Sequence, residues 1–372
     1  MKIAFYNPIN VSFMSGPEVW ITKMLPLLSK MGFDVTLYTT KFKRSCDYKN
    51  IYRKLEKEGV KIIELNYFLM PLSGSMIPWD FIKYAKKNYD YLYFFNGFAF
   101  QDLIAYFMSK IFRAKFIYSI HAPIITNYFL HNIYQKVISS NIIRLSSKIH
   151  VVNRRDKIKL AFLNKKTFIV APGPGNDFSG KFTKKNMIKK INDDTCRIIF
   201  LGRLSPQKNI SKLLKVIQSF SDDKKIKFYI SGRGEQEADV INYTHRYYNL
   251  DYLGFVKTED IPKVYSDKHY FINLSVYETF CVTIIEAMSL GIPVISTCTQ
   301  GICSDCRSQS PIASLPIDFK ISDAVKKINQ LKELYFEDKK RYKYLSSEAI
   351  RTSSLFNWDI QSKKFVSSLL DT

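Results

Sequence analysis

The stretch HYFINLSVYETFCVTIIEAMSLGIPVISTCTQG, residues 269–301, predicts a strand, a loop, a helix and a second strand in succession. Residues 270–274 form a short apolar run of the kind that is buried in a parallel sheet. After a loop at 275–281, residues 282–290 show helical periodicity, and Gly291 supplies a C-terminal stop signal. Pro293 follows that glycine and precedes the next predicted strand, 294–297. This order of elements is typical of an α/β domain.

Two carboxylates bracket the junction between the predicted loop and helix. Glu278 lies in the loop and Glu286 in the helix, with seven residues between them. In α/β sheets, ligands bind at the carboxyl ends of the strands, and the first N–H groups of the next helix favour an anion. The pair therefore suits a ligand that carries both phosphate and sugar hydroxyls. In the alternative interpretation, Glu278 only interacts with the helix dipole and Glu286 lies on a solvated helix face.

The residues around this pair resemble the Glu-x7-Glu segment of retaining GT-B glycosyltransferases, in particular glycosyltransferase family 4. The matching pattern is S-x-x-E-T-F-C-V-x-x-x-E-A-M-S-x-G-x-P-V-I, residues 275–295. The family usually has E-G-F-G where this chain has E-T-F-C, so that Thr279 and Cys281 replace both glycines. Small side chains still allow a phosphate to approach, but a positive φ at these positions becomes unfavourable.

Length and alternation of predicted elements indicate two α/β domains. The 372 residues match two domains of about 180 residues, and strands that alternate with helices favour parallel, doubly wound sheets. The resemblance implies a GT-B fold, in which two Rossmann-like domains face a central cleft. Residues 1–180 would be the acceptor-binding domain and 195–355 the nucleotide-sugar-binding domain. Residues 356–372 would form a closing helix that crosses back to the first domain.

In the first domain, apolar runs predict strands that alternate with helices. The strands are expected at 2–6, 35–39, 60–65, 91–95, 115–120 and 148–152, and the helices at 17–31, 48–58, 79–87, 100–112 and 126–145. Pro26 should kink or interrupt the first helix, because a proline removes a helical hydrogen bond. The sequence S-G-P-E at 15–18 resembles the family's G-G-x-E loop, which implies that Gly16 contacts the donor diphosphate.

One histidine of the first domain is a candidate site residue. His121 directly follows the predicted strand KFIYSI, where it could bond a ligand, titrate near neutral pH, or serve only as a structural histidine. It matches the family's strand-end histidine, which implies contact with the donor sugar and phosphate.

The second domain begins with a predicted strand, 197–201, and the loop G-R-L-S-P-Q-K-N. Arg203 and Lys208 in this loop could clamp a diphosphate, or could be two solvated basic residues. The loop closely matches the family's phosphate-binding loop. S-G-R-G-E at 231–235 resembles the family's G-x-G-x-E turn, and 252–256 resembles the strand whose backbone contacts the nucleotide base.

The resemblance implies a reaction and a set of site residues. The reaction is transfer of a sugar, of the hexosyl type, from a nucleotide-diphosphate sugar such as a UDP- or GDP-sugar, with retention of anomeric configuration. No metal or other cofactor is expected, because the basic pair would take the place of a divalent ion. The implied catalytic residues are Glu278, His121, Arg203 and Lys208. The implied donor-binding residues are Gly16, Arg203, Lys208, Gly232, Phe255, Glu278, Thr279, Phe280, Cys281, Val282 and Glu286.

The charge of the chain indicates an anionic partner. The net charge is +23, and residues 1–195 hold 31 Lys and Arg against 13 Asp and Glu. A basic first half suits a glycan or lipid-linked acceptor with phosphate, or peripheral contact with an anionic membrane, although a merely Lys-rich surface would look the same. The first residues are too polar for a signal peptide, which predicts a cytoplasmic protein, at the inner face of the membrane if the membrane contact is made.

The same residues are compatible with two other classes of protein. A basic nucleic-acid-binding protein would use the many aromatic residues for stacking, but no zinc-finger, RRM or homeodomain pattern is present. A non-catalytic relative would bind nucleotide without transfer. Cys303 and Cys306 form the C-x-x-C pair, which we interpret as free thiols rather than as half of a zinc site.

Overall fold

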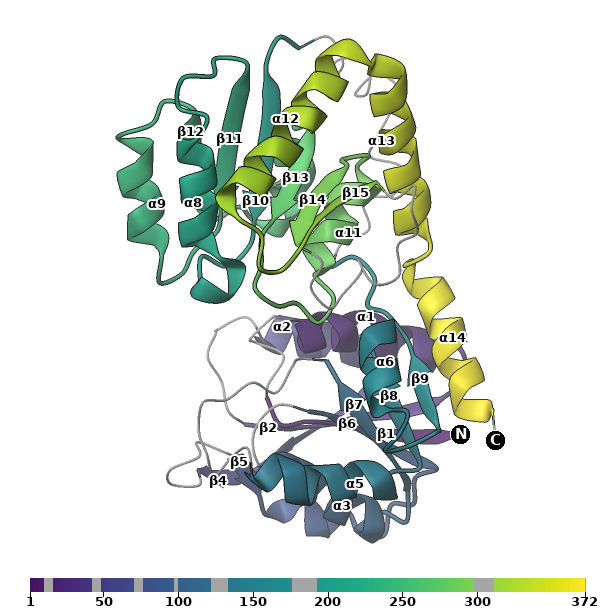
Figure 1. Ribbon diagram of the computed structural model, residues 1–372. Helices are drawn as coiled ribbons and strands as arrows, with labels where there is room; N and C mark the ends of the chain where they lie inside the picture. The colour runs from purple at the N-terminus through teal and green to yellow at the C-terminus, as the bar shows by residue number, and fades with distance from the viewer. Residues whose placement is uncertain are drawn as a thin grey trace. The chain divides into compact units, whose positions relative to one another are not determined.

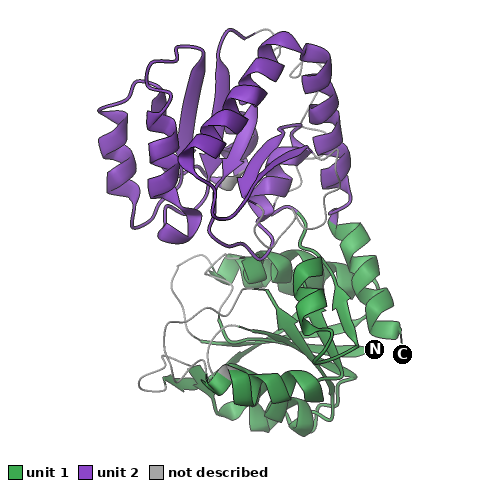
Figure 2. Ribbon diagram, in the orientation of Figure 1, with its two compact units in different colours: residues 1–173, 358–372 green, residues 174–357 purple. Residues whose placement is uncertain are grey.

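The computed structural model describes residues 1–9, 16–41, 48–69, 76–96, 100–121, 133–175, 193–297 and 311–371. The chain forms two compact units (Figure 2): the first comprises Met1–Gly173 and Trp358–Thr372, and the second Pro174–Asn357. The run at 180–194 is rich in Lys and Asn, a composition that predicts an interdomain linker, and most of it lies outside the described residues, as do Cys303 and Cys306.

The first unit is built on a parallel sheet in the order β3-β2-β1-β6-β7-β8-β9 (Figure 1). Its strands are β1 (Lys2–Asn7), β2 (Asp34–Thr40), β3 (Lys61–Leu65), β6 (Tyr91–Phe95), β7 (Lys115–Ile120), β8 (Lys148–Val151) and β9 (Thr167–Ile169). A separate antiparallel pair joins β4 (Tyr67–Leu69) to β5 (Met76–Pro78). The helices are α1 (Gly16–Lys30), α2 (Tyr48–Lys57), α3 (Gln101–Ile111), α5 (Ser140–Leu145), α6 (Arg154–Leu160) and α14 (Trp358–Leu370).

Two expectations for the first unit need correction, on the segment 79–87 and on Pro26. The helix expected at 79–87 is only a 3₁₀ segment, η2 (Asp80–Tyr84), because the Asp80 carboxylate accepts hydrogen bonds from the backbone and side chain of Asn66 and ties this segment to the β4–β5 pair. The described part of the helix expected at 126–145, residues 133–145, is helical, and it includes a π-helical segment, η3 (Gln135–Ser139), before α5. Pro26 does not interrupt α1, because Met24, Leu25 and Leu28 around it are buried and hold the helix against the core.

An aromatic cluster forms the core on one face of this sheet. Trp20 of α1 stacks on Tyr93 of β6, with ring centroids 5.4 Å apart. Phe365 of α14 meets both rings, at 5.5 Å from Trp20 and 5.7 Å from Tyr93, and is fully buried. The last helix of the chain thus completes the core of the unit that contains the chain's beginning.

We expect Phe365→Ala to lower the free energy of unfolding of the first unit by about 3–5 kcal/mol, because it empties the centre of this cluster. All three tryptophans, Trp20, Trp79 and Trp358, belong to this unit, so that tryptophan fluorescence during urea unfolding reports on it. Phe162→Ala is the matched control, since Phe162 is 80% exposed and its loss should cost less than about 0.5 kcal/mol. Equal effects of the two substitutions would contradict the packing described here.

The second unit is built on another parallel sheet, in the order β12-β11-β10-β13-β14-β15 (Figure 1). Its strands are β10 (Cys196–Leu201), β11 (Ile226–Ser231), β12 (Leu250–Tyr252), β13 (Tyr270–Asn273), β14 (Val294–Thr297) and β15 (Ile312–Leu315). Its α-helices are α8 (Ile210–Gln218), α9 (Glu237–Thr244), α10 (Ile261–Tyr265), α11 (Val282–Ser289), α12 (Ile321–Glu337) and α13 (Lys339–Ser354), and its 3₁₀ segments are η4 (Pro206–Lys208) and η5 (Thr258–Asp260).

The central strands of this sheet are covered on both faces. Every residue of β13 and β14 is buried, as expected for apolar runs in a parallel sheet between helix layers. The strand–loop–helix–strand order predicted for 269–297 is therefore confirmed, and α11 ends before Gly291, whose φ is +69°. The strand expected at 252–256 is instead β12, which ends at Tyr252.

Candidate active site

The candidate site lies where the order of the second sheet reverses direction. Strand β10 pairs with β11 on one side and with β13 on the other, so that the loops after β10 and β13 leave neighbouring strand ends. Such a switch point opens a crevice at the carboxyl ends of the strands. The loop after β10 carries Arg203 and Lys208, and the loop after β13 carries Glu278.

A buried ion pair joins these two loops. The Lys208 ammonium donates a hydrogen bond to Oε1 of Glu278, and the Ser275 hydroxyl lies 2.7 Å from the same oxygen. The two charged side chains are only 17% and 10% exposed. The structure thus brings together Lys208 and Glu278, which are 70 residues apart in the sequence.

The pKa of Lys208 is raised although the side chain is buried. Burial alone would lower the pKa of this ammonium, but negative charge at Cys281 and Glu278, together with the hydrogen bond to Glu278, outweighs it. Burial raises the pKa of the Cys281 thiol to about 11, so that this thiol is neutral near pH 7. The Glu278 carboxylate is therefore the partner that keeps Lys208 charged under ordinary conditions.

Cys281 contradicts the expectation that its backbone would avoid a positive φ. It precedes α11 with φ 68° and ψ 77°, the left-handed conformation that the family's glycine would adopt without strain. Its surroundings hold this conformation: the residue is buried, and Sγ lies 3.3 Å from Nδ2 of Asn273 and 3.4 Å from Oγ1 of Thr283. Thr279, at the other replaced glycine, has no positive φ.

Glu286 is buried rather than solvated. This residue of α11 is 6% exposed, and its Oε1 accepts a hydrogen bond of 3.1 Å from the backbone N–H of Gly175. The alternative in which Glu286 sits on a solvated helix face is therefore wrong. Phe280 is also buried, with its ring 5.3 Å from that of Phe356, so that only its backbone is available to a ligand.

A pocket of about 310 Å³ lies at the carboxyl ends of β10 and β11. It brings together three of the predicted residues, Arg203, Gly232 and Phe255. Gly232 is required by packing, because a Cβ there would lie 1.8 Å from the carbonyl oxygen of Gly202. Sequence reasoning missed Arg233, whose guanidinium lies 5.4 Å from the centre of the Phe255 ring; its position between the two glycines of G-R-G was the available signal.

His121 does not titrate near neutral pH. It follows β7 in the first unit, where its Nε2 lies 2.8 Å from the Tyr93 hydroxyl and its ring 5.2 Å from that of His150. Burial and then the charge of His150 hold the pKa of His121 well below its ordinary value. The imidazole is therefore neutral at pH 7. Gly16 begins α1 in the same unit, with open space where a Cβ would be.

Among the described residues, no group of three or more His, Cys, Asp and Glu side chains is arranged to hold a metal ion. None of the helices within those residues has the length and apolar character needed to cross a membrane.

Comparison with known proteins identifies the second unit. Residues 181–351 match the family described as "Glycosyl transferases group 1". The second unit belongs to this family. The predicted resemblance is therefore confirmed, and it covers the part of the chain that carries the Lys208–Glu278 pair.

Curated relatives match different shares of the chain. O-antigen chain mannosyltransferase B of Escherichia coli is 34% identical over 26% of this chain and 27% of its own length. Mannosylfructose-phosphate synthase of Agrobacterium fabrum is 22% identical over 81% of this chain and 75% of its own length. The chain covers less than a third of the length of the first curated relatives that it matches.

Solved structures share the fold over the whole chain. Anabaena HepE in complex with UDP and glucose has a TM-score of 0.73 and 16% identity, covering 100% of both chains. The lipopolysaccharide outer core galactosyltransferase WaaB has a TM-score of 0.72 and 14% identity, covering 99% of both. The predicted GT-B fold, with two Rossmann-like α/β units, is thereby confirmed.

Replacement of a buried residue by alanine usually leaves a protein more stable than replacement by glycine. We expect the opposite order at Cys281, because its backbone is left-handed. Cys281→Gly should be more stable than Cys281→Ala by about 1 kcal/mol, because alanine keeps the strain of a left-handed residue. At Cys196, a buried strand residue without positive φ, Ala should be the more stable by about 0.5–1 kcal/mol. Urea unfolding followed by circular dichroism measures both pairs, and the same order at both sites would contradict the strain.

We expect the first unit to lose stability as the pH falls from about 6.5 towards 4. Burial lowers the pKa of His150 to about 4, against a hydrogen bond to the Val170 carbonyl that acts the other way. In this pH window the unfolded chain binds more protons at this histidine than the folded chain does. The free energy of unfolding is therefore lower by about 2 kcal/mol at pH 5 than at neutral pH. The measurement is urea unfolding by tryptophan fluorescence at several pH values. His150→Gln should make the dependence shallower without abolishing it, because the pKa of His121 is also held low. His245→Gln, at an exposed site in the second unit, is the control.

Proposed function

We propose that the protein is a retaining glycosyltransferase of family 4, which transfers a sugar from a nucleotide-diphosphate sugar to an acceptor. The observation that carries the proposal is the buried Lys208–Glu278 pair at the switch point of the second sheet, beside the beginning of α11. A buried cation and a buried carboxylate next to the N-terminus of a helix suit a ligand that is both anionic and rich in hydroxyls.

Arg203 and Lys208 would bind the diphosphate of the donor. Arg203 lies close enough for its charge to oppose that of Lys208, so that the two cations share one anion site. They would stabilise the negative charge that builds on the leaving diphosphate, together with backbone N–H groups at Thr279 to Val282. We propose that no metal is needed, because these groups supply the positive charge.

Glu278 would exchange partners when the donor binds. Without a ligand its carboxylate accepts a hydrogen bond from Lys208. A diphosphate attracts the Lys208 ammonium, which leaves lone pairs of Glu278 available to the hydroxyls of the transferred sugar. Glu286 would bind the ribose hydroxyls through its carboxylate, which also accepts a hydrogen bond from Gly175 N.

The pocket beside Arg203 would hold the nucleotide base. Gly232 and Phe255 line it, and the exposed Phe255 ring offers a flat apolar surface against which a base can stack. In the first unit, Gly16 would contact the diphosphate through its backbone. His121 would act as a neutral hydrogen-bond partner of the sugar, and not as a group that gains or loses a proton near neutral pH.

For the acceptor we propose a glycan or a lipid-linked glycan. The relatives' names include an O-antigen chain mannosyltransferase and a mannosylfructose-phosphate synthase, which supports a sugar-containing acceptor. The basic first half would attract phosphate on such an acceptor, or an anionic membrane that holds it. We propose that the protein is cytoplasmic and lies at the inner face of the membrane.

We expect one of UDP, GDP and ADP to raise the melting temperature of the protein in a thermal-shift assay. A ligand at about a hundred times its Kd adds about 2.7 kcal/mol to the folded state, which should raise Tm by several degrees. Arg203→Ala/Lys208→Ala should abolish the shift, because it removes both cations of the diphosphate site. The control is Lys339→Ala/Lys340→Ala, an exposed pair in the same unit, which should keep the full shift.

The responding nucleotide would identify the base of the donor. No shift with any of the three nucleotides, or an equal shift in both double variants, would contradict the proposed site.

A further inference from the structure

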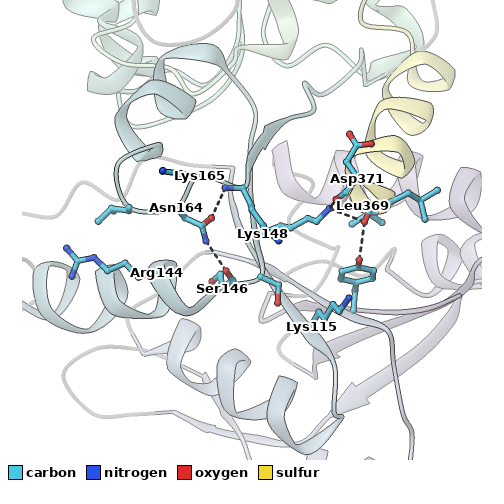
Figure 3. Close-up of a pocket in the computed structure, with 13 residues that line it drawn as sticks. Lys115, Arg144, Ser146, Lys148, Asn164, Lys165, Leu369 and Asp371 are labelled. Carbon is cyan, nitrogen blue, oxygen red and sulfur yellow. Dashed lines mark hydrogen bonds between the residues drawn. The ribbon is translucent and has the colours of Figure 1, made fainter.

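A second basic cavity lies in the first unit, at the opposite edge of its sheet from the strand ends that carry His121. It measures about 650 Å³ and is lined by the beginnings of β6, β7 and β8, the loop before β9, and the end of α14 (Figure 3). These are the amino ends of parallel strands, whereas the carboxyl ends are the usual ligand edge of an α/β sheet. Neither the family pattern nor the proposed reaction uses this cavity.

Five cationic side chains line the cavity, and only one carboxylate, that of Asp371, is among its lining residues. Lys115, Arg144, Lys165 and Lys166 have no carboxylate within 4.0 Å among the residues that the structure describes. They come from three separate connections of the chain, so that the fold, and not one run of basic sequence, gathers them.

The fifth cation, Lys148, is fixed in the wall of the cavity. Its ammonium donates hydrogen bonds to the backbone carbonyls of Ser368, Leu369 and Asp371 at the end of α14 (Figure 3). Tyr91 donates a further bond to the Leu369 carbonyl. The opposite side is tied by Asn164, which donates to the carbonyls of Ile143 and Ser146. The cavity is therefore formed before any ligand arrives.

The cations repel one another in this arrangement. Burial lowers the pKa of Lys148, and the charges of Lys166 and Lys115 lower it further, against the opposite effect of Asp371. The positive charge is thus not neutralised within the described part of the unit. A bound anion would relieve this repulsion, and Arg and Lys are the side chains that bind phosphate best.

We propose that this cavity is a second anion site, which binds a compound or lipid headgroup that carries more than one phosphate. Adjacent phosphates concentrate several negative charges in a small volume, which matches four unpaired cations around one cavity. A polymer that carries carboxylates along its length would spread its negative charges beyond the cavity. The proposal does not depend on the glycosyltransferase function, because no residue of the donor site takes part.

The test is calorimetric titration with inorganic tripolyphosphate at about 0.15 M salt, where weak surface attraction is screened. It uses Arg203→Ala/Lys208→Ala protein, so that phosphate binding at the donor site cannot contribute. In that background, Lys165→Gln/Lys166→Gln should weaken binding by about tenfold or more, because two of the unpaired cations are lost. The matched control is Lys363→Gln/Lys364→Gln, an exposed adjacent pair on α14 that does not line the cavity.

A second arm separates a soluble source of phosphate from a lipid. The same variants are sedimented with phosphatidylcholine vesicles that contain phosphatidylinositol phosphate, and with phosphatidylcholine alone. Tripolyphosphate binding that depends on Lys165 and Lys166 assigns a soluble ligand, and vesicle binding alone with that dependence assigns a headgroup. Binding of neither probe, or equal loss in the cavity variant and its control, would overturn the proposal.

Discussion

The Lys208–Glu278 ion pair is the interaction on which the candidate site depends. Taking either charge out of water is costly, and breaking a buried pair by removal of one partner leaves an uncompensated charge. The two loops after β10 and β13 are therefore held together at neighbouring strand ends. The pair also raises the pKa of Lys208, which keeps this cation charged. In the proposed function, a bound diphosphate replaces Glu278 as the partner of Lys208, so that one buried interaction takes the place of another.

Backbone constraints place the rest of the site around this pair. Cys281 accepts a left-handed conformation so that α11 begins beside Glu278, and its thiol is held by Asn273 and Thr283. Gly232 allows the turn after β11 to lie against the Gly202 carbonyl, where any side chain would collide. Strained or close-packed backbone of this kind persists only where the surroundings determine it, and it is common at binding sites.

The first unit has two chemically different edges. At the carboxyl ends of its strands, aromatic rings and buried histidines form a neutral environment, in which Tyr93 bonds His121. At the amino ends, lysines from several connections gather around the end of α14. Burial explains why the first edge is neutral, because desolvation favours the uncharged form of the imidazole. At the second edge four of the five cations, Lys115, Arg144, Lys165 and Lys166, are exposed to water and remain available to an anion.

The sequence by itself determined the α/β order of elements, and it named the residues of the diphosphate site that we propose. The apolar run at 270–274, the helical period after it and the stop at Gly291 are local signals, so that β13, α11 and β14 could be predicted from them. The motif residues Arg203, Lys208 and Glu278 could be named for the same reason. Only the tertiary structure decided that Cys281 adopts a positive φ, that Glu286 is buried against Gly175, and that His121 is neutral. These properties depend on desolvation and on contacts with residues far away in the chain, which no local pattern records.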